Sequence, residues 1–196
     1  MPQDGFQKYL DSFKSIKGLG AGIGVLVPGF TYFTKYAPPY FPGITLLTAA
    51  VATATVVITY YYSPSLVRGS PHTLPPLLKT AIKVFVISIL LLLLFTILLD
   101  LCTVVVPGTT QRMQIGFGEL DWSLTPYGQH VKATRPLATP QQWLWDESFS
   151  TNAPKLIWIW WTIHLSGILI TLVFMFAFVL WTFGWSLIAK QKALQN

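Results

Sequence analysis

Charged residues and cysteine are both scarce in this 196-residue chain. Only 10% of its residues are charged, against about 25% in an average soluble domain, and seven acidic residues stand against thirteen Lys and Arg. The single cysteine, Cys102, excludes a disulfide within the chain and argues against a cysteine-based metal site. Hydrophobic residues make up 53% of the chain, and its eight Trp and eight Tyr suit two membrane interfaces. The composition therefore favours a membrane protein.

Motifs of catalysis and cofactor binding are also missing from the sequence. The three histidines, His72, His130 and His164, are expected in two loops on opposite sides and in one helix, so they cannot converge on one metal. No HExxH, Gly-x-Ser-x-Gly or phosphate-loop pattern occurs, and Ser166 beside Gly167 has no second catalytic group at a useful spacing. The basic residues are dispersed, unlike those of a nucleic-acid-binding surface. We therefore expect no enzymatic activity, cofactor, metal or nucleic-acid partner.

The longest apolar run, at residues 81–106, determines the predicted fold class. About 20 apolar residues in a helix cover the roughly 30 Å hydrocarbon core of a bilayer. A buried helix of a soluble domain is the alternative, but the chain offers too little other protein to cover such a run on every side. With further apolar segments at residues 18–34, 44–62 and 155–188, the sequence predicts an all-α integral membrane protein with four transmembrane helices.

The N-terminal residues 1–17 have an amphipathic pattern. Phe6, Leu10 and Phe13 fall on one helical face, with charged residues on the other. This pattern predicts a helix that lies on the membrane surface or docks on the rest of the protein.

The longest polar stretch, residues 107–154, is expected to form a small cap between the third and fourth helices. Thr139-Pro140 followed by Gln142 predicts a capped short helix over residues 140–149. Alternating apolar residues within 113–124 allow a short strand or hairpin.

The last segment, residues 155–196, combines a long fourth helix with a cytoplasmic tail. Its apolar part is longer than the hydrocarbon core, so we expect the helix to tilt or protrude. Trp158, Trp160 and Trp161 are expected to mark one membrane interface, and Trp181 and Trp185 the other.

Small residues open the first apolar segment. Gly18 with Gly22 and Gly20 with Gly24 make two overlapping small-xxx-small pairs. Such pairs let helix backbones approach closely, either within the chain or between subunits.

Threonines recur along one face of the second segment, at Thr45, Thr48, Thr55 and Thr59. Their spacing matches a helix that faces one partner along its whole length. Hydroxyls in such a seam either bond to a neighbouring helix or line a hydrated path.

Two ionisable residues lie within the apolar segments, Asp100 in the third and His164 in the fourth. Both are expected roughly 10 to 14 Å below the same membrane surface, so they could pair. Ionisable residues at such a depth are costly, which makes them functional candidates. The pair predicts an ion- or proton-sensing site, a hydrogen bond that fixes helix register, or an aspartate that water reaches from the surface.

Residues 37–48 and 114–128 resemble segments of small multi-spanning bacterial membrane proteins, some of them similar in build to membrane effectors of antiphage defence. In such effectors a small helical protein oligomerises and breaches or depolarises the inner membrane. The resemblance implies a homo-oligomer in the inner membrane. Because the chain has no nucleotide-sensor domain, it also implies a protein partner that supplies the trigger.

Two hypotheses of function follow. In the first, the chain is a non-enzymatic oligomeric pore or membrane-depolarising effector whose threonine seam lines a path. In the second, it is a membrane anchor or accessory subunit that docks a separate protein, and its polar seams are used in packing. Ion flux in liposomes separates the two.

The distribution of basic residues predicts the orientation. With four crossings, eight basic residues fall on one side and five on the other. The larger group is Lys8, Lys14, Lys17, Arg68, Lys79, Lys83, Lys190 and Lys192, and the smaller is Lys35, Arg112, Lys132, Arg135 and Lys155. Both termini are therefore expected in the cytoplasm, whereas a first segment that re-enters instead of crossing would place the N-terminus outside. A reporter fused after Asn196 should read cytoplasmic, and a cysteine introduced at Gln129 should react with a membrane-impermeant reagent from outside; labelling from the cytoplasmic face alone would reverse the orientation.

Overall fold

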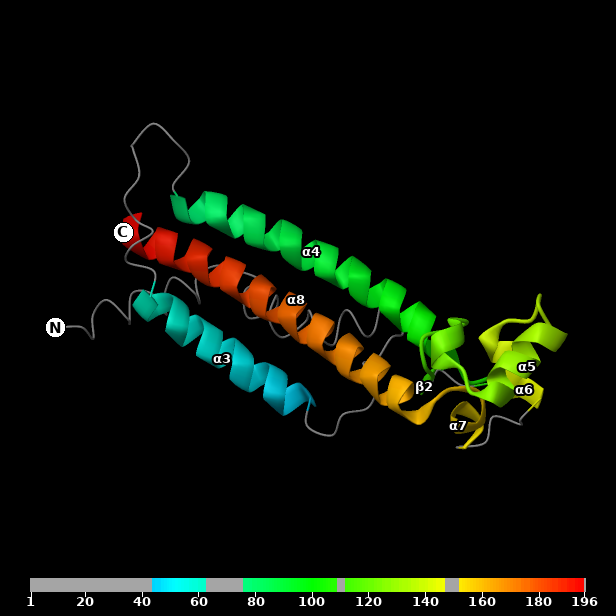
Figure 1. Cartoon of the computed structure of the whole chain (residues 1–196). Coiled ribbons are helices and arrows are strands. Elements are labelled where there is room, and N and C mark those ends of the chain that lie inside the picture. Colours follow the sequence, from blue (N-terminus) through cyan, green and yellow to red (C-terminus); the bar gives the residue numbers. More distant parts are fainter. Residues whose placement is uncertain (1–43, 63–75, 109–111, 147–151, 196) are drawn as a thin grey trace. The chain divides into compact units, whose positions relative to one another are not determined.

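The computed structural model describes residues 44–62, 76–108, 112–146 and 152–195, and this part of the chain is mostly helical (Figure 1). It contains two helices that are long and apolar enough to cross a membrane, over Leu77–Cys102 and Trp160–Lys192. The expected amphipathic helix at residues 1–17, the first apolar segment at 18–34 and the four glycines Gly18, Gly20, Gly22 and Gly24 lie outside the described residues.

The chain divides into two compact units. Of the described residues, the first unit contains 44–62, 76–92 and 174–195, which are entirely helical. The second contains the remainder, from Leu93 to Val173, and includes the cap.

Helix α3, Ile44–Tyr62, has 19 residues and occupies the range given for the second apolar segment. Two of its threonines donate hydrogen bonds within the helix, from Thr55 Oγ1 to the Val51 carbonyl and from Thr59 Oγ1 to the Thr55 carbonyl, each 2.7 Å. Thr59 is buried. The side chains of Thr45 and Thr48 lie outside the described part.

Helix α4, Pro76–Cys102, differs at both ends from the expected range of residues 81–106. It begins five residues earlier, at Pro76. Proline is well suited to the first helical position, because it lacks a backbone N–H and an N–H there would have no partner within the helix. It ends at Cys102, since the β-branched run that follows forms strand β1, Thr103–Val105. The expected helical continuation to residue 106 is therefore wrong.

Within the first unit, α4 and α8 make specific contacts. The Ser88 hydroxyl donates to the Ala177 carbonyl at 2.7 Å, and both groups are buried. The Phe85 ring meets the Trp181 and Trp185 rings edge-on, with centroids 5.0 and 5.4 Å apart. A hydroxyl and three aromatic rings thus fix how the two helices pack.

The second unit contains the cap, a set of short elements between the long helices. In chain order they are β1, β2 (Arg112–Gln114), η2 (Asp121–Ser123), α5 (Pro126–Thr134), α6 (Pro140–Asp146) and α7 (Ala153–Ile157), and α8 (Trp160–Gln195) follows. Strands β1 and β2 pair antiparallel, with Val104 opposite Met113. Of the stretch at residues 113–124, where the alternating pattern allows a strand, β2 includes Met113 and Gln114. Its partner β1 lies in the run that was expected to be helical.

A compact apolar core holds the cap together. It is formed by buried side chains of five segments, namely Val104, Ile115, Leu124, Trp143, Leu144, Ala153, Ile157 and Trp158. Helix α6 contributes Trp143 and Leu144, and its start has a capping box in which Thr139 N–H donates to Gln142 Oε1 at 2.8 Å. Of the expected helix over residues 140–149, α6 covers Pro140–Asp146.

The fourth apolar segment is interrupted near its start. Trp158 forms an isolated antiparallel bridge with Leu124, and Ile159 N–H donates to the Ser123 carbonyl at 2.9 Å. These bonds hold the chain extended between α7 and α8. The expectation of one continuous helix that begins at Lys155 is therefore wrong. Trp158 is also no interface marker, because its buried indole N–H donates to the Gly118 carbonyl at 2.7 Å.

Candidate functional site

Asp100 and Arg112 form an ion pair at the end of α4, with Arg112 Nη2 and Asp100 Oδ1 3.0 Å apart. The aspartate side chain is 64% exposed, whereas the arginine side chain is only 12% exposed. The pair joins the last turn of α4 to strand β2. It therefore connects α4 to the cap, and its energy as an ion pair is small because the aspartate side chain is largely exposed.

Arg112 has a second role that the ion pair alone does not show. Its Nη1 donates to the Leu99 carbonyl at 3.2 Å and to the Thr103 hydroxyl at 2.7 Å. The Thr103 hydroxyl donates in turn to the same Leu99 carbonyl at 2.6 Å. The last four carbonyls of a helix have no partner within it, and a positive charge there also complements the helix dipole. Arg112 therefore caps the C-terminus of α4.

Gln114, two residues along the same strand, reaches the first turns of α8. Its amide nitrogen donates to the Ile163 carbonyl and approaches the Ser166 hydroxyl at 3.4 Å. The amide lies against Gly167, where any Cβ would overlap it. A glycine at this position lets the polar side chain lie directly on the helix backbone.

Ser166 is completely buried, and its hydroxyl donates to the Ile115 and Ile163 carbonyls, each at 2.8 Å. One turn earlier, Thr162 is also buried, and its hydroxyl donates to the Ile159 carbonyl at 2.7 Å and approaches the Ser123 carbonyl of the cap at 3.4 Å. Both hydroxyls are used in joining α8 to the cap. This arrangement gives Ser166 the geometry of a structural residue.

His164 lies on the exposed side of α8, where its ring meets the Trp160 ring edge-on with centroids 5.6 Å apart. The expected pair of Asp100 and His164 is replaced by two separate contacts, since Asp100 has its ion pair with Arg112. Arg112 lies on strand β2, which pairs with the strand that directly follows α4, so its guanidinium lies next to Asp100.

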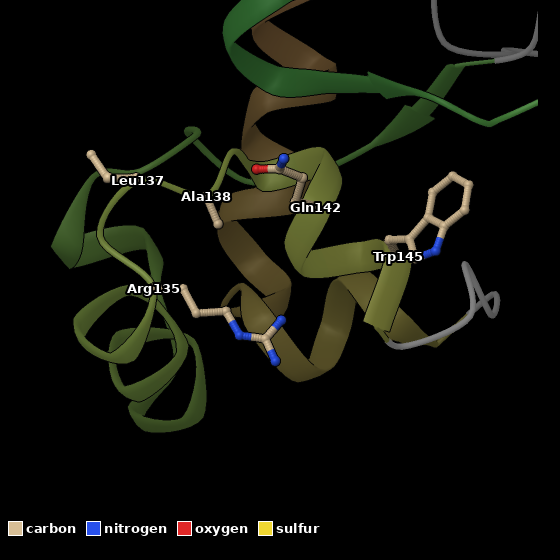
Figure 2. A pocket seen from close by; sticks show the side chains of 5 residues that line it. All are labelled: Arg135, Leu137, Ala138, Gln142 and Trp145. Carbon is tan, nitrogen blue, oxygen red and sulfur yellow. The ribbon is translucent and has the colours of Figure 1, made fainter.

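A shallow depression of about 450 Å³ opens on the surface of the cap (Figure 2). It lies between the end of α5 and helix α6, and its lining residues are Arg135, Leu137, Ala138, Gln142 and Trp145. Leu137 is 97% exposed and Trp145 is 62% exposed. In Figure 1, α5 and α6 lie beyond the first turn of α8. The depression thus combines apolar surface with a guanidinium.

Comparisons with protein-family models, with curated proteins and with solved structures find no match. Within the described ranges, no three His, Cys, Asp or Glu side chains gather where they could hold a metal ion.

Neither Arg112 nor Gln114 stands out in the sequence as a structural connection. Arg112 is one of the dispersed basic residues, and Gln114 lies in the stretch that allows a short strand. Pro107-Gly108 between a β-branched run and Arg112-Met-Gln114 is a hairpin signal that indicates where these side chains lie. Their partners on the long helices depend on contacts between distant parts of the chain.

Replacing Arg112 tests whether it acts mainly as a helix cap. Arg112→Met should lower the free energy of unfolding in detergent by about 1.5–3 kcal/mol, because a charged donor to backbone and hydroxyl oxygens is lost in a largely buried site. Asp100→Asn should cost less than about 1 kcal/mol, since that side chain is exposed. Arg112→Lys, which keeps the charge without the planar fork, should fall between them. Equal losses for Arg112→Met and Asp100→Asn would assign the stabilisation to the ion pair instead.

Proposed function

We propose that this chain is an integral membrane protein that acts as an anchor or accessory subunit and presents its cap to a separate protein partner. The observation that carries the proposal is the contrast between apolar, largely uncovered helices and a folded cap with an apolar and basic depression. The uncovered apolar helices suit a bilayer, and the depression on the cap suits a protein partner outside the bilayer.

The surfaces of the two long helices support insertion in a bilayer. Only 22% of the apolar window of α4 and 39% of that of α8 are buried within the protein. A core helix of a soluble domain would be covered on most sides, whereas lipid covers the exposed side chains of a transmembrane helix. Helix α3 would add a crossing, since 19 residues extend about 28 Å. Residues 18–34 would provide the remaining crossing. The chain would then cross a bacterial inner membrane four times, with both termini in the cytoplasm.

The hydroxyls of the helices support an anchor over a pore. Those of Thr55, Thr59, Thr171, Thr182 and Ser186 each donate to a carbonyl three or four residues earlier in the same helix. Such bonds satisfy the hydroxyl without water and suit an apolar environment. A seam that lines a hydrated path would instead direct its hydroxyls toward that path.

The chemistry of the depression supports a protein partner. Exposed tryptophan beside arginine is the composition found at the energetic centres of protein interfaces. Trp145 and Leu137 offer apolar area, and Arg135 favours a negatively charged neighbour. A segment with an acidic residue beside an apolar one matches this surface.

Ion flux distinguishes the anchor from the pore-forming effector that the resemblance implies. Liposomes that contain the purified protein should pass ions no faster than protein-free liposomes. Thr55→Val should change the unfolding free energy by no more than about 0.5 kcal/mol, because its bond to the Val51 carbonyl lies within one helix. Flux that rises with the amount of protein and disappears in this variant would instead establish the pore.

The docking surface is tested by a photo-crosslinking residue at Leu137, in cells, with Ala133 on α5 as the matched exposed control. We expect one discrete adduct with a different protein at position 137 and none at 133. Trp145→Ala should reduce the adduct roughly tenfold, as expected for a tryptophan at the centre of an interface. An adduct only with a second copy of this chain would point to a homo-oligomer, and no adduct at 137 would remove the docking role.

A further inference from the structure

Three exposed side chains of the cap and of the first turn of α8 make up what we call the aromatic ledge: Leu120, Trp122 and Trp161. The Trp122 and Trp161 rings are stacked with centroids 6.0 Å apart and planes 27° apart. The buried ring of Phe117 also contacts Trp122, with centroids 4.9 Å apart. The ring of Trp122 therefore contacts both the interior of the cap and α8.

About half of each ledge side chain is exposed: Trp122 is 50% exposed, Leu120 45% and Trp161 44%. Exposed aromatic and aliphatic side chains that gather on a folded unit fit a partner of matching chemistry.

The surface of α8 indicates which partner covers the ledge. Trp161 is followed on α8 by the exposed residues Leu165, Ile168 and Leu172, at steps of four, three and four residues. These steps place all four on one helical face. The ledge is thus the end of an apolar stripe that runs along a helix long and apolar enough to cross a membrane.

Polar groups border the ledge on the cap. Lys132 Nζ pairs with Asp121 Oδ1 at 2.7 Å and donates to the Glu119 carbonyl at 2.8 Å. Tryptophan with paired and basic groups on one side and aliphatic side chains on the other is typical of the headgroup layer of a membrane.

We propose that the aromatic ledge lies in the interfacial layer of the bilayer, with Leu120 and Trp122 among lipid headgroups and upper acyl chains. The inference rests on the proposed membrane insertion of α8 and adds that the cap itself binds lipid. Because Trp122 joins the cap to the first turn of α8, contact with the interface fixes the depth at which the cap sits.

The depth of the ledge can be measured by spin labelling. Cys102→Ala removes the native thiol, and Leu120→Cys and Trp122→Cys each carry a nitroxide in the full chain, reconstituted in phosphatidylethanolamine and phosphatidylglycerol vesicles. Collision with oxygen, which concentrates in lipid, is compared with collision with a water-soluble nickel chelate. Ile168→Cys on the stripe and Ala133→Cys on α5 provide the lipid and water references. Leu120→Cys keeps the stack intact, so it reports even where Trp122→Cys does not fold.

We expect the ratio of oxygen to nickel accessibility at Leu120 and Trp122 to lie between the two references and severalfold above that at Ala133. A ratio equal to that at Ala133, with a lipid-like ratio at Ile168, would overturn the ledge while leaving the proposed function intact. Low accessibility to both reagents at Leu120 and Trp122 would show that protein covers the ledge and would also overturn it. A water-like ratio at Ile168 would overturn both proposals.

Discussion

The backbone carbonyls at the end of α4 need hydrogen-bond partners, and the cap supplies them from residues that include a segment also bonded to the first turns of α8. Arg112 and the Thr103 hydroxyl bond the Leu99 carbonyl, and Ile115 N–H donates to the Cys102 carbonyl at 2.9 Å. The same segment bonds α8 through Gln114 and through the Ile115 carbonyl. A helix end without partners is costly wherever water is excluded, and the segment that satisfies the end of α4 also bonds α8, so the cap folds against both helices.

Close backbone contacts extend the same constraint through the cap. Thr125 N–H donates to the Ile157 carbonyl at 2.9 Å, and Gly128 lies so close to the Ile157 backbone that any Cβ would overlap it. With the Trp158 indole bonded to Gly118, the segment between α7 and α8 is held from two sides. The cap is consequently a well-packed body despite its short helices and single hairpin.

The parts that the sequence predicted are those determined by neighbouring residues. The helix at residues 44–62 follows from an apolar run between turn signals, and the start of α6 follows from Thr139, Pro140 and Gln142. Strand β1 was missed because a continuous apolar run reads equally well as helix or strand until its pairing partner is known. The break at Trp158 depends on the bridge to Leu124, and the ion pair of Asp100 depends on Arg112 of a neighbouring strand. Both were missed because these partners are known only from the folded chain.

The connections at Arg112 and Gln114 also bear on how a partner can act. A ligand shifts a conformational equilibrium only by the difference between its affinities for the two states. Separating α4 from α8 at the cap would break several hydrogen bonds, each of about 1–3 kcal/mol when charged or buried. Together these approach the roughly 8 kcal/mol with which a micromolar partner binds in total. On the proposed function, a partner in the depression beside Trp145 would therefore meet a rigid cap and would be recruited to the membrane without parting the two helices.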